Sequence, residues 1–214
     1  FDYSTTESET GMKIRYHYVV IEGNIGAGKT TLATRISEEF NARLILEKFA
    51  DNPFLPKFYS DPEKYSFPLE LSFLASRYKQ LQEELVPQDL FKAFTVADYY
   101  FMKSLVFSSK TLEKDEFSLY RQIFYIIYGS LPKPDIFVYL HLNPDRLLQN
   151  IEKRGRNYEK SINREYLQKI QESYFTFFRQ NPENRYLHPP RELEVLSQGP
   201  PCRLQGSERI RSHH

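Results

Sequence analysis

The segment from Gly23 to Thr31, with the sequence GNIGAGKTT, combines residue types that hold phosphate groups. It fits the pattern G-x-x-x-x-G-K-[ST], in which backbone N–H groups surround a phosphate chain, the lysine reaches the outer phosphates and the next hydroxyl binds Mg²⁺. A chance glycine turn is the alternative, but a strand pattern before the loop and a helical pattern after it favour a nucleoside triphosphate site. The residues predicted to bind the triphosphate are Gly23, Asn24, Ile25, Gly26, Ala27, Gly28, Lys29, Thr30 and Thr31.

Two carboxylates follow apolar segments that we predict to be strands. Glu47 comes after the strand 43–46, and Asp98 comes after the strand 94–97. Glu47 can act as general base for a hydroxyl that attacks the terminal phosphate, and it would repel an acceptor that already carries a phosphate. Asp98 can hold Mg²⁺ together with Thr30. The structural alternatives are a turn or cap for Glu47 and a helix N-cap for Asp98.

Two arginines lie near the end of a predicted helix, in the segment KRGRNYE at 153–159. Arg154 and Arg156 can fold over a bound triphosphate and neutralise the charge that spreads in the transition state. Basic residues at this place also suit the helix dipole without any catalytic role. The phosphate-binding motif upstream favours a catalytic lid.

Strand-like and helix-like segments alternate along the chain, which predicts an α/β fold with helices on both sides of a parallel sheet. We predict strands at 16–21, 43–46, 94–97 and 136–142, helices at 30–40, 74–85, 117–128, 144–151 and 166–178, and a loop with short helical turns at 52–68. Ligands of such sheets gather at the carboxyl ends of the strands. The phosphate-binding segment, Glu47 and Asp98 are all predicted to lie at strand ends.

Length and composition indicate one domain. The chain has 214 residues, of which 40% are hydrophobic, and a net charge of +1 that gives no reason to expect a nucleic-acid or membrane partner. Its single cysteine, Cys202, excludes a disulfide within the chain and suggests the reducing cytoplasm. We predict a polar N-terminal tail or linker at 1–11, a domain at 12–196 and a disordered tail at 197–214.

The ordered set of motifs resembles the deoxynucleoside kinase family, and most closely its bacterial purine-type members. The resemblance runs from about Tyr16 to Phe178 and rests on GNIGAGKTT, on Glu47 followed by NPFLPKFY, on LELSFLASR at 69–77 and on RGRNYE. It implies a P-loop kinase fold with a short arginine lid, which transfers the γ-phosphate of ATP to the 5′-hydroxyl of a deoxynucleoside in nucleotide salvage. Mg²⁺ is the implied cofactor, and a homodimer is expected from the aromatic-rich helices.

The resemblance also implies roles for individual residues. Glu47 matches the general base for the 5′-hydroxyl. Tyr59 and Glu159 match the pair that binds the sugar 3′-hydroxyl, and Arg77 matches an arginine near the nucleobase. Glu70 falls where many members have a glutamine that reads the nucleobase.

Three departures from the family pattern are visible. Asp98-Tyr99-Tyr100 stands where the family usually has an acidic residue, arginine and serine, so Lys103, one helical turn on, is the candidate to replace the missing charge. Glu70 in place of glutamine only accepts hydrogen bonds when ionised, which favours the donor-rich edge of guanine and hence deoxyguanosine over deoxyadenosine. Near the C-terminus only the segment 192–196 resembles the further strand of the family.

Two other functions remain open from the residues. A thymidylate-type nucleoside monophosphate kinase needs basic residues at the acceptor phosphate, and the only cation beside Glu47 in the sequence is Lys48. A nucleotide-binding module without catalysis is suggested by Tyr99 and by the atypical C-terminal segment. Turnover of a nucleoside compared with its monophosphate separates the first alternative from a nucleoside kinase.

Overall fold

The computed structural model describes residues 16–48, 52–85, 91–156, 159–182 and 184–187. The predicted tails at 1–11 and 197–214 and the candidate strand at 192–196 lie outside these residues. The strands are β1 (Tyr18–Gly23), β2 (Arg43–Ile45), β3 (Thr95–Ala97), β4 (Ile136–Leu140) and β5 (Tyr186–Leu187). The helices are α1 (Lys29–Glu39), α2 (Leu55–Ser60), α3 (Pro62–Leu85), α4 (Met102–Thr111), α5 (Lys114–Tyr128), α6 (Pro144–Arg154) and α7 (Arg164–Gln180).

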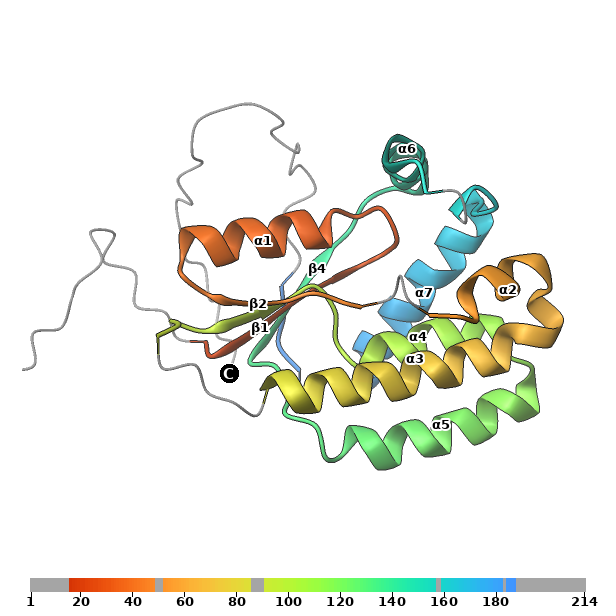
Figure 1. The fold of residues 1–214 in the computed structure, drawn as a ribbon, viewed down its shortest axis with the longest axis horizontal. Helices are drawn as coiled ribbons and strands as arrows, with labels where there is room; N and C mark the ends of the chain where they lie inside the picture. The colour runs from red at the N-terminus through yellow and green to blue at the C-terminus, as the bar shows by residue number, and fades with distance from the viewer. Residues whose placement is uncertain (1–15, 49–51, 86–90, 157–158, 183, 188–214) are drawn as a thin grey trace, which may run out of the picture.

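The five strands form one parallel sheet in the order β2-β3-β1-β4-β5 (Figure 1). In the central strand β1, Val19 pairs with Val96 of β3 on one side and with Ile136 of β4 on the other. Because all strands run in the same direction, the residues that follow β1, β2 and β3 meet at one edge of the sheet. The predicted parallel sheet is confirmed.

Helices cover both faces of the sheet. On one face, α1 covers the sheet (Figure 1). Ala33 of α1 packs there with Ile21 and Val96. On the other face, α3, α4, α5 and α7 surround an aromatic core in which Phe101 and Phe124 stack with ring centroids 4.9 Å apart. A strand covered on both sides needs apolar residues at successive positions, which explains the run of apolar and aromatic residues at 18–21 in β1.

The segment 52–68 differs from the prediction of a loop with short helical turns. It contains α2 and the first turns of α3, and Pro68 lies inside α3. A proline removes one backbone donor from a helix interior and disfavours it there. Burial of Leu69, Leu74 and Leu81 along one face of α3 outweighs this local preference.

Two further elements were absent from the prediction. Helix α4 lies between β3 and α5, and the short strand β5 extends the sheet beside β4. Among the described residues, no helix combines the length and apolar character needed to cross a membrane.

Local residues define both ends of α6. Asn143 Oδ1 accepts a hydrogen bond from the backbone N–H of Arg146 at 2.8 Å, and Pro144 occupies the first turn. The helix ends at Gly155, whose positive φ of 72° suits the left-handed conformation of a helix C-terminus. These two signals place Arg154 at the last position of α6 and Arg156 just beyond it.

Candidate active site

The phosphate loop, Gly23–Thr31, joins β1 to α1 and packs directly on α6. Gly26 has a φ of +81°, and a Cβ on it would lie 2.8 Å from the carbonyl oxygen of Leu147 in α6. Asn150, also in α6, donates a hydrogen bond to the carbonyl oxygen of Gly26 at 2.8 Å. The loop and the helix that carries Arg154 therefore form one packed unit.

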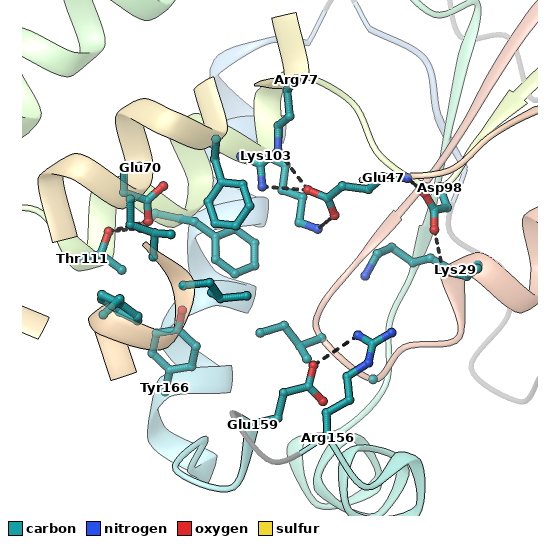
Figure 2. Close-up of a pocket in the computed structure, with 18 of the residues that line it drawn as sticks. Lys29, Glu47, Glu70, Arg77, Asp98, Lys103, Thr111, Arg156, Glu159 and Tyr166 are labelled. Atoms are coloured by element: carbon teal, nitrogen blue, oxygen red, sulfur yellow. Dashed lines mark hydrogen bonds and ion pairs between the residues drawn. The ribbon is translucent and has the colours of Figure 1, made fainter. Parts of the chain in front are cut away.

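Lys29 lies at the start of α1 and points into the site (Figure 2). Its Nζ donates to the carbonyl oxygen of Asn24, within the same loop, at 2.8 Å. Burial and the nearby Lys103 lower the pKa of Lys29 to about 8, although Glu22 and other carboxylates oppose this shift. An incoming phosphate would favour the charged lysine in the same way as these carboxylates do.

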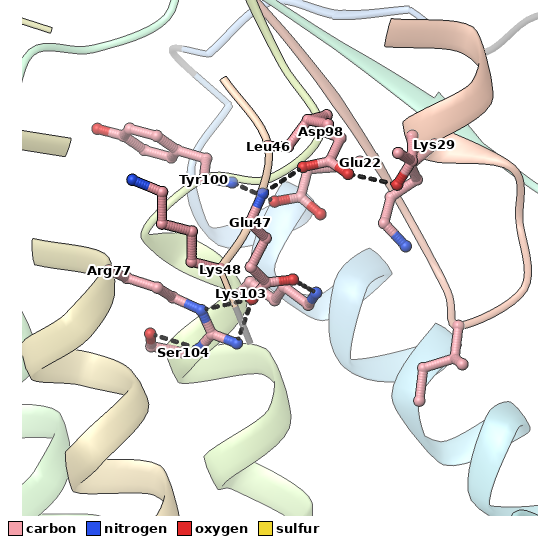
Figure 3. Close-up of polar contacts among 12 residues, drawn as sticks. Glu22, Lys29, Leu46, Glu47, Lys48, Arg77, Asp98, Tyr100, Lys103 and Ser104 are labelled. Carbon is pink, nitrogen blue, oxygen red and sulfur yellow. Dashed lines mark hydrogen bonds and ion pairs between the residues drawn. The ribbon is translucent and has the colours of Figure 1, made fainter. Parts of the chain in front are cut away.

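Glu47 is held by two cations at the carboxyl end of β2 (Figure 3). Its Oε1 accepts from Nε and Nη2 of Arg77 at 2.9 and 2.8 Å, and its Oε2 accepts from Nζ of Lys103. Arg77 also donates to Ser104 Oγ at 2.8 Å. Burial alone would raise the pKa of Glu47, but Lys103 and Arg77 outweigh it and lower the pKa to about 2. The carboxylate is therefore ionised at neutral pH, and it serves neither as a cap nor as a turn residue.

Lys103 supplies the positive charge that the sequence lacks at position 99. Tyr99 is fully buried in the aromatic core, whereas Lys103 of α4 reaches Glu47. The prediction that Lys103 replaces the missing charge agrees with this geometry. The neighbouring Lys48 instead pairs with Glu84 at 3.0 Å, and its side chain is 73% exposed.

Asp98 links β2, β3 and the phosphate loop. Its Oδ2 accepts from the hydroxyl of Thr30, and its Oδ1 accepts from the backbone N–H of Glu47 at 2.8 Å. It does not cap α4, whose N-cap residue is Phe101. Among the described residues no group of three or more His, Cys, Asp or Glu side chains could hold a metal. One carboxylate and one hydroxyl beside a phosphate site nevertheless fit Mg²⁺, which takes most of its ligands from water and substrate phosphates.

The lid arginines, Arg154 and Arg156, both contact Glu159. Arg154 Nη2 lies 2.6 Å from each carboxylate oxygen of Glu159, and Arg156 Nη1 lies 3.4 Å from Oε1. Glu159 is buried, whereas both arginine side chains are 35% exposed. Both arginines line the cavity, and their shared partner is the buried carboxylate of Glu159.

One cavity joins these groups (Figure 2). Its empty volume, including the space at its open entrance, is about 930 Å³. The predicted site residues that line it are Ile25, Gly26, Lys29, Thr30, Glu47, Glu70, Arg77, Asp98, Arg154, Arg156 and Glu159. Tyr59 belongs to α2, but its side chain lies outside the described part of the structure.

Glu70 and Arg77 face the cavity from α3, and Glu70 lies at the end away from the phosphate loop (Figure 2). Glu70 is 3% exposed, and its Oε1 accepts from the hydroxyl of Thr111 at 2.8 Å. The guanidinium of Arg77 lies over the ring of Phe73, 4.8 Å from the centroid. Phe73 and Phe107 supply flat apolar surface in this part of the cavity.

Sequence reasoning missed several members of the site. Glu22 is fully buried, and accepts from the backbone N–H of Tyr100 and the hydroxyl of Tyr174, both at 2.9 Å. Ser104 and Thr111 were missed together with α4. The helical spacing of Met102, Leu105, Val106 and Ser109 was the available signal for that helix.

Comparison with known proteins gives a family for this arrangement. The family model described as deoxynucleoside kinase matches residues 19–197. A deoxyguanosine kinase of Bacillus subtilis (strain 168) is 41% identical over 167 residues, 78% of this chain and 80% of that protein. A deoxyadenosine kinase of Dictyostelium discoideum is 32% identical over 162 residues, 75% of this chain and 66% of that protein.

A solved structure has the same fold. It is deoxyadenosine kinase from M. mycoides with products dCMP and a flexible dCDP bound, 25% identical, with a TM-score of 0.71 over 83% of this chain and 92% of that one. The chain therefore belongs to the deoxynucleoside kinase family and has the P-loop kinase fold. It is an enzyme that phosphorylates deoxynucleosides, with a nucleotide as phosphate donor. These comparisons give no support to the two alternatives, a nucleoside monophosphate kinase and a binding module without catalysis.

We expect the substitution Lys103→Gln to lower kcat about tenfold, because Glu47 loses one of its two charged donors and the geometry of its carboxylate loosens. Steady-state phosphorylation of a deoxynucleoside measures the effect. Lys110→Gln, an exposed lysine in the last turn of the same helix, is the matched control. Equal rates for both variants would show that Lys103 does not support Glu47.

Proposed function

We propose that this kinase transfers the γ-phosphate of ATP to the 5′-hydroxyl of a purine deoxynucleoside in nucleotide salvage. The observation that supports this most is the order of groups in the cavity (Figure 2). Lys29 lies at one end, Glu47 lies between, and Glu70 lies at the other end. A nucleoside with its nucleobase beside Glu70 would bring its 5′-hydroxyl toward Glu47 and the phosphate loop.

The groups of the chain divide the chemical work. Glu47 accepts the proton of the 5′-hydroxyl as the oxygen attacks the γ-phosphate. Lys29 and the lid arginines neutralise the charge on the transferring phosphoryl group. Thr30 and Asp98 would hold Mg²⁺, which would offset the negative charge of the phosphates. Tyr59 and Glu159 are proposed to bind the sugar 3′-hydroxyl.

Binding of ATP would change the partners of the cations. Lys29 donates to Asn24 and the lid arginines contact Glu159 in this structure. The phosphates of ATP would take over these donors, which leaves Glu159 available to the sugar. Because Arg154 and Arg156 would exchange Glu159 for the phosphates of ATP, closure of the lid would depend on a bound triphosphate.

The nucleobase preference rests on Glu70 and on the relatives. A buried carboxylate accepts hydrogen bonds and rejects a base edge that lacks donors. Guanine offers N1–H and its 2-amino group side by side. We therefore propose deoxyguanosine as the preferred substrate over deoxyadenosine, in line with the activity named for the B. subtilis relative.

A panel with radiolabelled ATP tests the proposal. The four deoxynucleosides and their 5′-monophosphates serve as acceptors, and kcat/KM is measured for each. We expect the two purine deoxynucleosides to react fastest and the monophosphates to be inert, because a 5′-monophosphate lacks the free 5′-hydroxyl whose proton Glu47 would accept. Preference for thymidine, or for any monophosphate, would contradict it.

A homodimer and a cytoplasmic location remain predictions. Helix α5 exposes Leu119 and Ile126, two helical turns apart, with exposed fractions of 51% and 79%. If this face forms the dimer, Ile126→Asp should produce monomers in sedimentation velocity experiments. Leu187→Asp, at an exposed apolar residue of β5, should leave the oligomeric state unchanged.

A further inference from the structure

The carboxyl group of Glu70 is buried with one oxygen unpaired. Its Oε1 accepts from Thr111, whereas Oε2 has no hydrogen-bond partner among the described residues. A buried polar atom without a partner carries a desolvation cost that a ligand group can remove. Because Glu70 lines the cavity, we take a nucleobase bound there as the group that would meet this oxygen.

The charged side chains near Glu70 form ion pairs with Glu47 and not with Glu70. The titratable and charged groups that face it are Arg77 of its own helix, Lys103 of α4 and Tyr120 of α5. Arg77 and Lys103 are both paired with Glu47, and the hydroxyl of Tyr120 donates to the backbone oxygen of Glu70 at 3.3 Å. Helix α2 contributes the apolar Leu55 and Phe58 to the cavity.

Both protonation states of Glu70 are therefore accessible near neutral pH. Burial raises the pKa of Glu70 to about 7, although the hydrogen bond from Thr111 and the charges of Arg77 and Lys103 lower it in part. The carboxyl group is predominantly protonated below this pH and predominantly ionised above it.

Thr111 decides which oxygen can carry the proton. Its hydroxyl lies 2.8 Å from Glu70 Oε1 and 3.3 Å from the carbonyl oxygen of Phe107, so the shorter contact to Glu70 is preferred. An oxygen that accepts this hydrogen acts as the carbonyl of the neutral acid. The proton then resides on Oε2, the oxygen without a partner.

We propose that Glu70 and Thr111 form a proton-dependent reader of the nucleobase, so that pH selects between deoxyguanosine and deoxyadenosine. The inference rests on the proposed function, in which Glu70 faces the base. It assigns a role to Thr111, which positions Glu70 and fixes its neutral form.

The two states of the reader suit different base edges. The ionised carboxylate only accepts, so it matches N1–H and the 2-amino group of guanine but repels the lone pair on N1 of adenine. The neutral acid donates from Oε2 and accepts at the second lone pair of Oε1. It can therefore pair with N1 and the 6-amino group of adenine, and equally with O6 and N1–H of guanine. Guanine can form two hydrogen bonds with either form of the Glu70 carboxyl group, whereas adenine can do so only with the neutral form.

The sign of the pH effect follows from this. Between pH 6 and pH 8 the neutral fraction of a group with a pKa of about 7 falls about tenfold. The kcat/KM for deoxyadenosine should fall with that fraction, while the value for deoxyguanosine should not. The ratio of kcat/KM for deoxyguanosine to that for deoxyadenosine should thus rise about tenfold. Using the ratio cancels the titration of ATP, Lys29 and other groups shared by both reactions.

The experiment measures this ratio from pH 6 to pH 8.5 in the native enzyme and in Glu70→Gln. Glutamine offers a donor and an acceptor at every pH, so its ratio should stay flat. A native ratio that does not change with pH would overturn the inference and leave the kinase activity intact. Absence of activity on both nucleosides at every pH would instead overturn the proposed function, and the inference with it.

Variants of Thr111 test whether its hydroxyl sets the pH at which the carboxyl group of Glu70 ionises. Thr111→Val removes a hydrogen bond that favours the ionised form, so the midpoint of the ratio should move upward by about one pH unit. Thr111→Ser keeps the hydroxyl and should restore the native midpoint. Thr176→Val removes a comparable threonine hydroxyl from the exposed face of α7 and should not move it. If Thr111→Val shows the same midpoint of the pH-dependent ratio as the native enzyme, Thr111 has no role in setting the protonation of Glu70.

Discussion

Replacing Lys29 with alanine is expected to lower kcat with deoxyguanosine by about 10³-fold, the upper range for one lost transition-state donor. Lys29 is the cation of the phosphate loop, and its Nζ has only the carbonyl oxygen of Asn24 as a hydrogen-bond partner among the described residues. The developing charge on the phosphoryl group would lose its closest fixed cation. Steady-state kinetics with saturating ATP and nucleoside measure the loss.

The fold should survive this change, because Lys29 makes one hydrogen bond to a loop and no contact in the main core. Thermal unfolding of Lys29→Ala should therefore resemble that of the native enzyme. Lys48→Ala is the matched control, since Lys48 is exposed and pairs only with Glu84 in the described structure. Near-normal turnover of Lys29→Ala would show that phosphoryl transfer does not take place at this loop.

The substitution Glu47→Gln should lower kcat by about 10²–10⁴-fold, because the amide cannot take the proton of the 5′-hydroxyl. Affinity for ATP should change little, since the carboxylate serves the acceptor. The pKa of about 2 means that the native Glu47 stays ionised down to strongly acidic pH. Its protonation should therefore contribute no loss of rate above about pH 4.

The Gln variant has a second consequence that must be measured separately. It leaves the buried cations Arg77 and Lys103 without their anion, and removal of one partner from a buried pair is destabilising. Thermal unfolding reports this loss, and kcat is then compared at a temperature where the variant is folded. Glu165→Gln, which breaks an exposed pair with Lys169, is the control. A variant that lost ATP binding but kept its rate at saturation would assign Glu47 to the nucleotide instead.

The sequence was sufficient to predict which residues meet in the candidate active site, because the signals for these residues are local. The phosphate loop is a contiguous pattern, and Glu47 and Asp98 each follow directly after a strand. Parallel connectivity then places these strand ends at one edge, so the convergence of Lys29, Glu47 and Asp98 could be predicted without coordinates. Asn143 and Gly155 likewise delimit α6 and thereby place the lid arginines.

The segment 52–68 shows where local signals mislead. Its prolines and aspartates are typical of a loop, but α3 continues through Pro68 because the helix buries an apolar face against α4 and α5. Helix α4 escaped prediction although it follows β3 closely. In the segment 52–68, the free energy of burial in the assembled core exceeds the local preference for turns, and no window of sequence contains that term. Helix α4 differs, because the helical spacing of its apolar residues was a local signal that the prediction did not use.

The contacts that tune the site depend on residues far apart in the chain. Lys103 reaches Glu47 across 56 positions, and Thr111 reaches Glu70 across 41. A strand-end position identified Glu47 and the family resemblance identified Glu70, but their different pKa values, about 2 and about 7, follow from which partners the packed helices bring to each carboxylate. The helices direct Arg77 and Lys103 toward Glu47, and these two cations keep its carboxylate ionised. The carboxyl group of Glu70 accepts a hydrogen bond only from the hydroxyl of Thr111 in the described structure, and its pKa therefore stays near neutral pH.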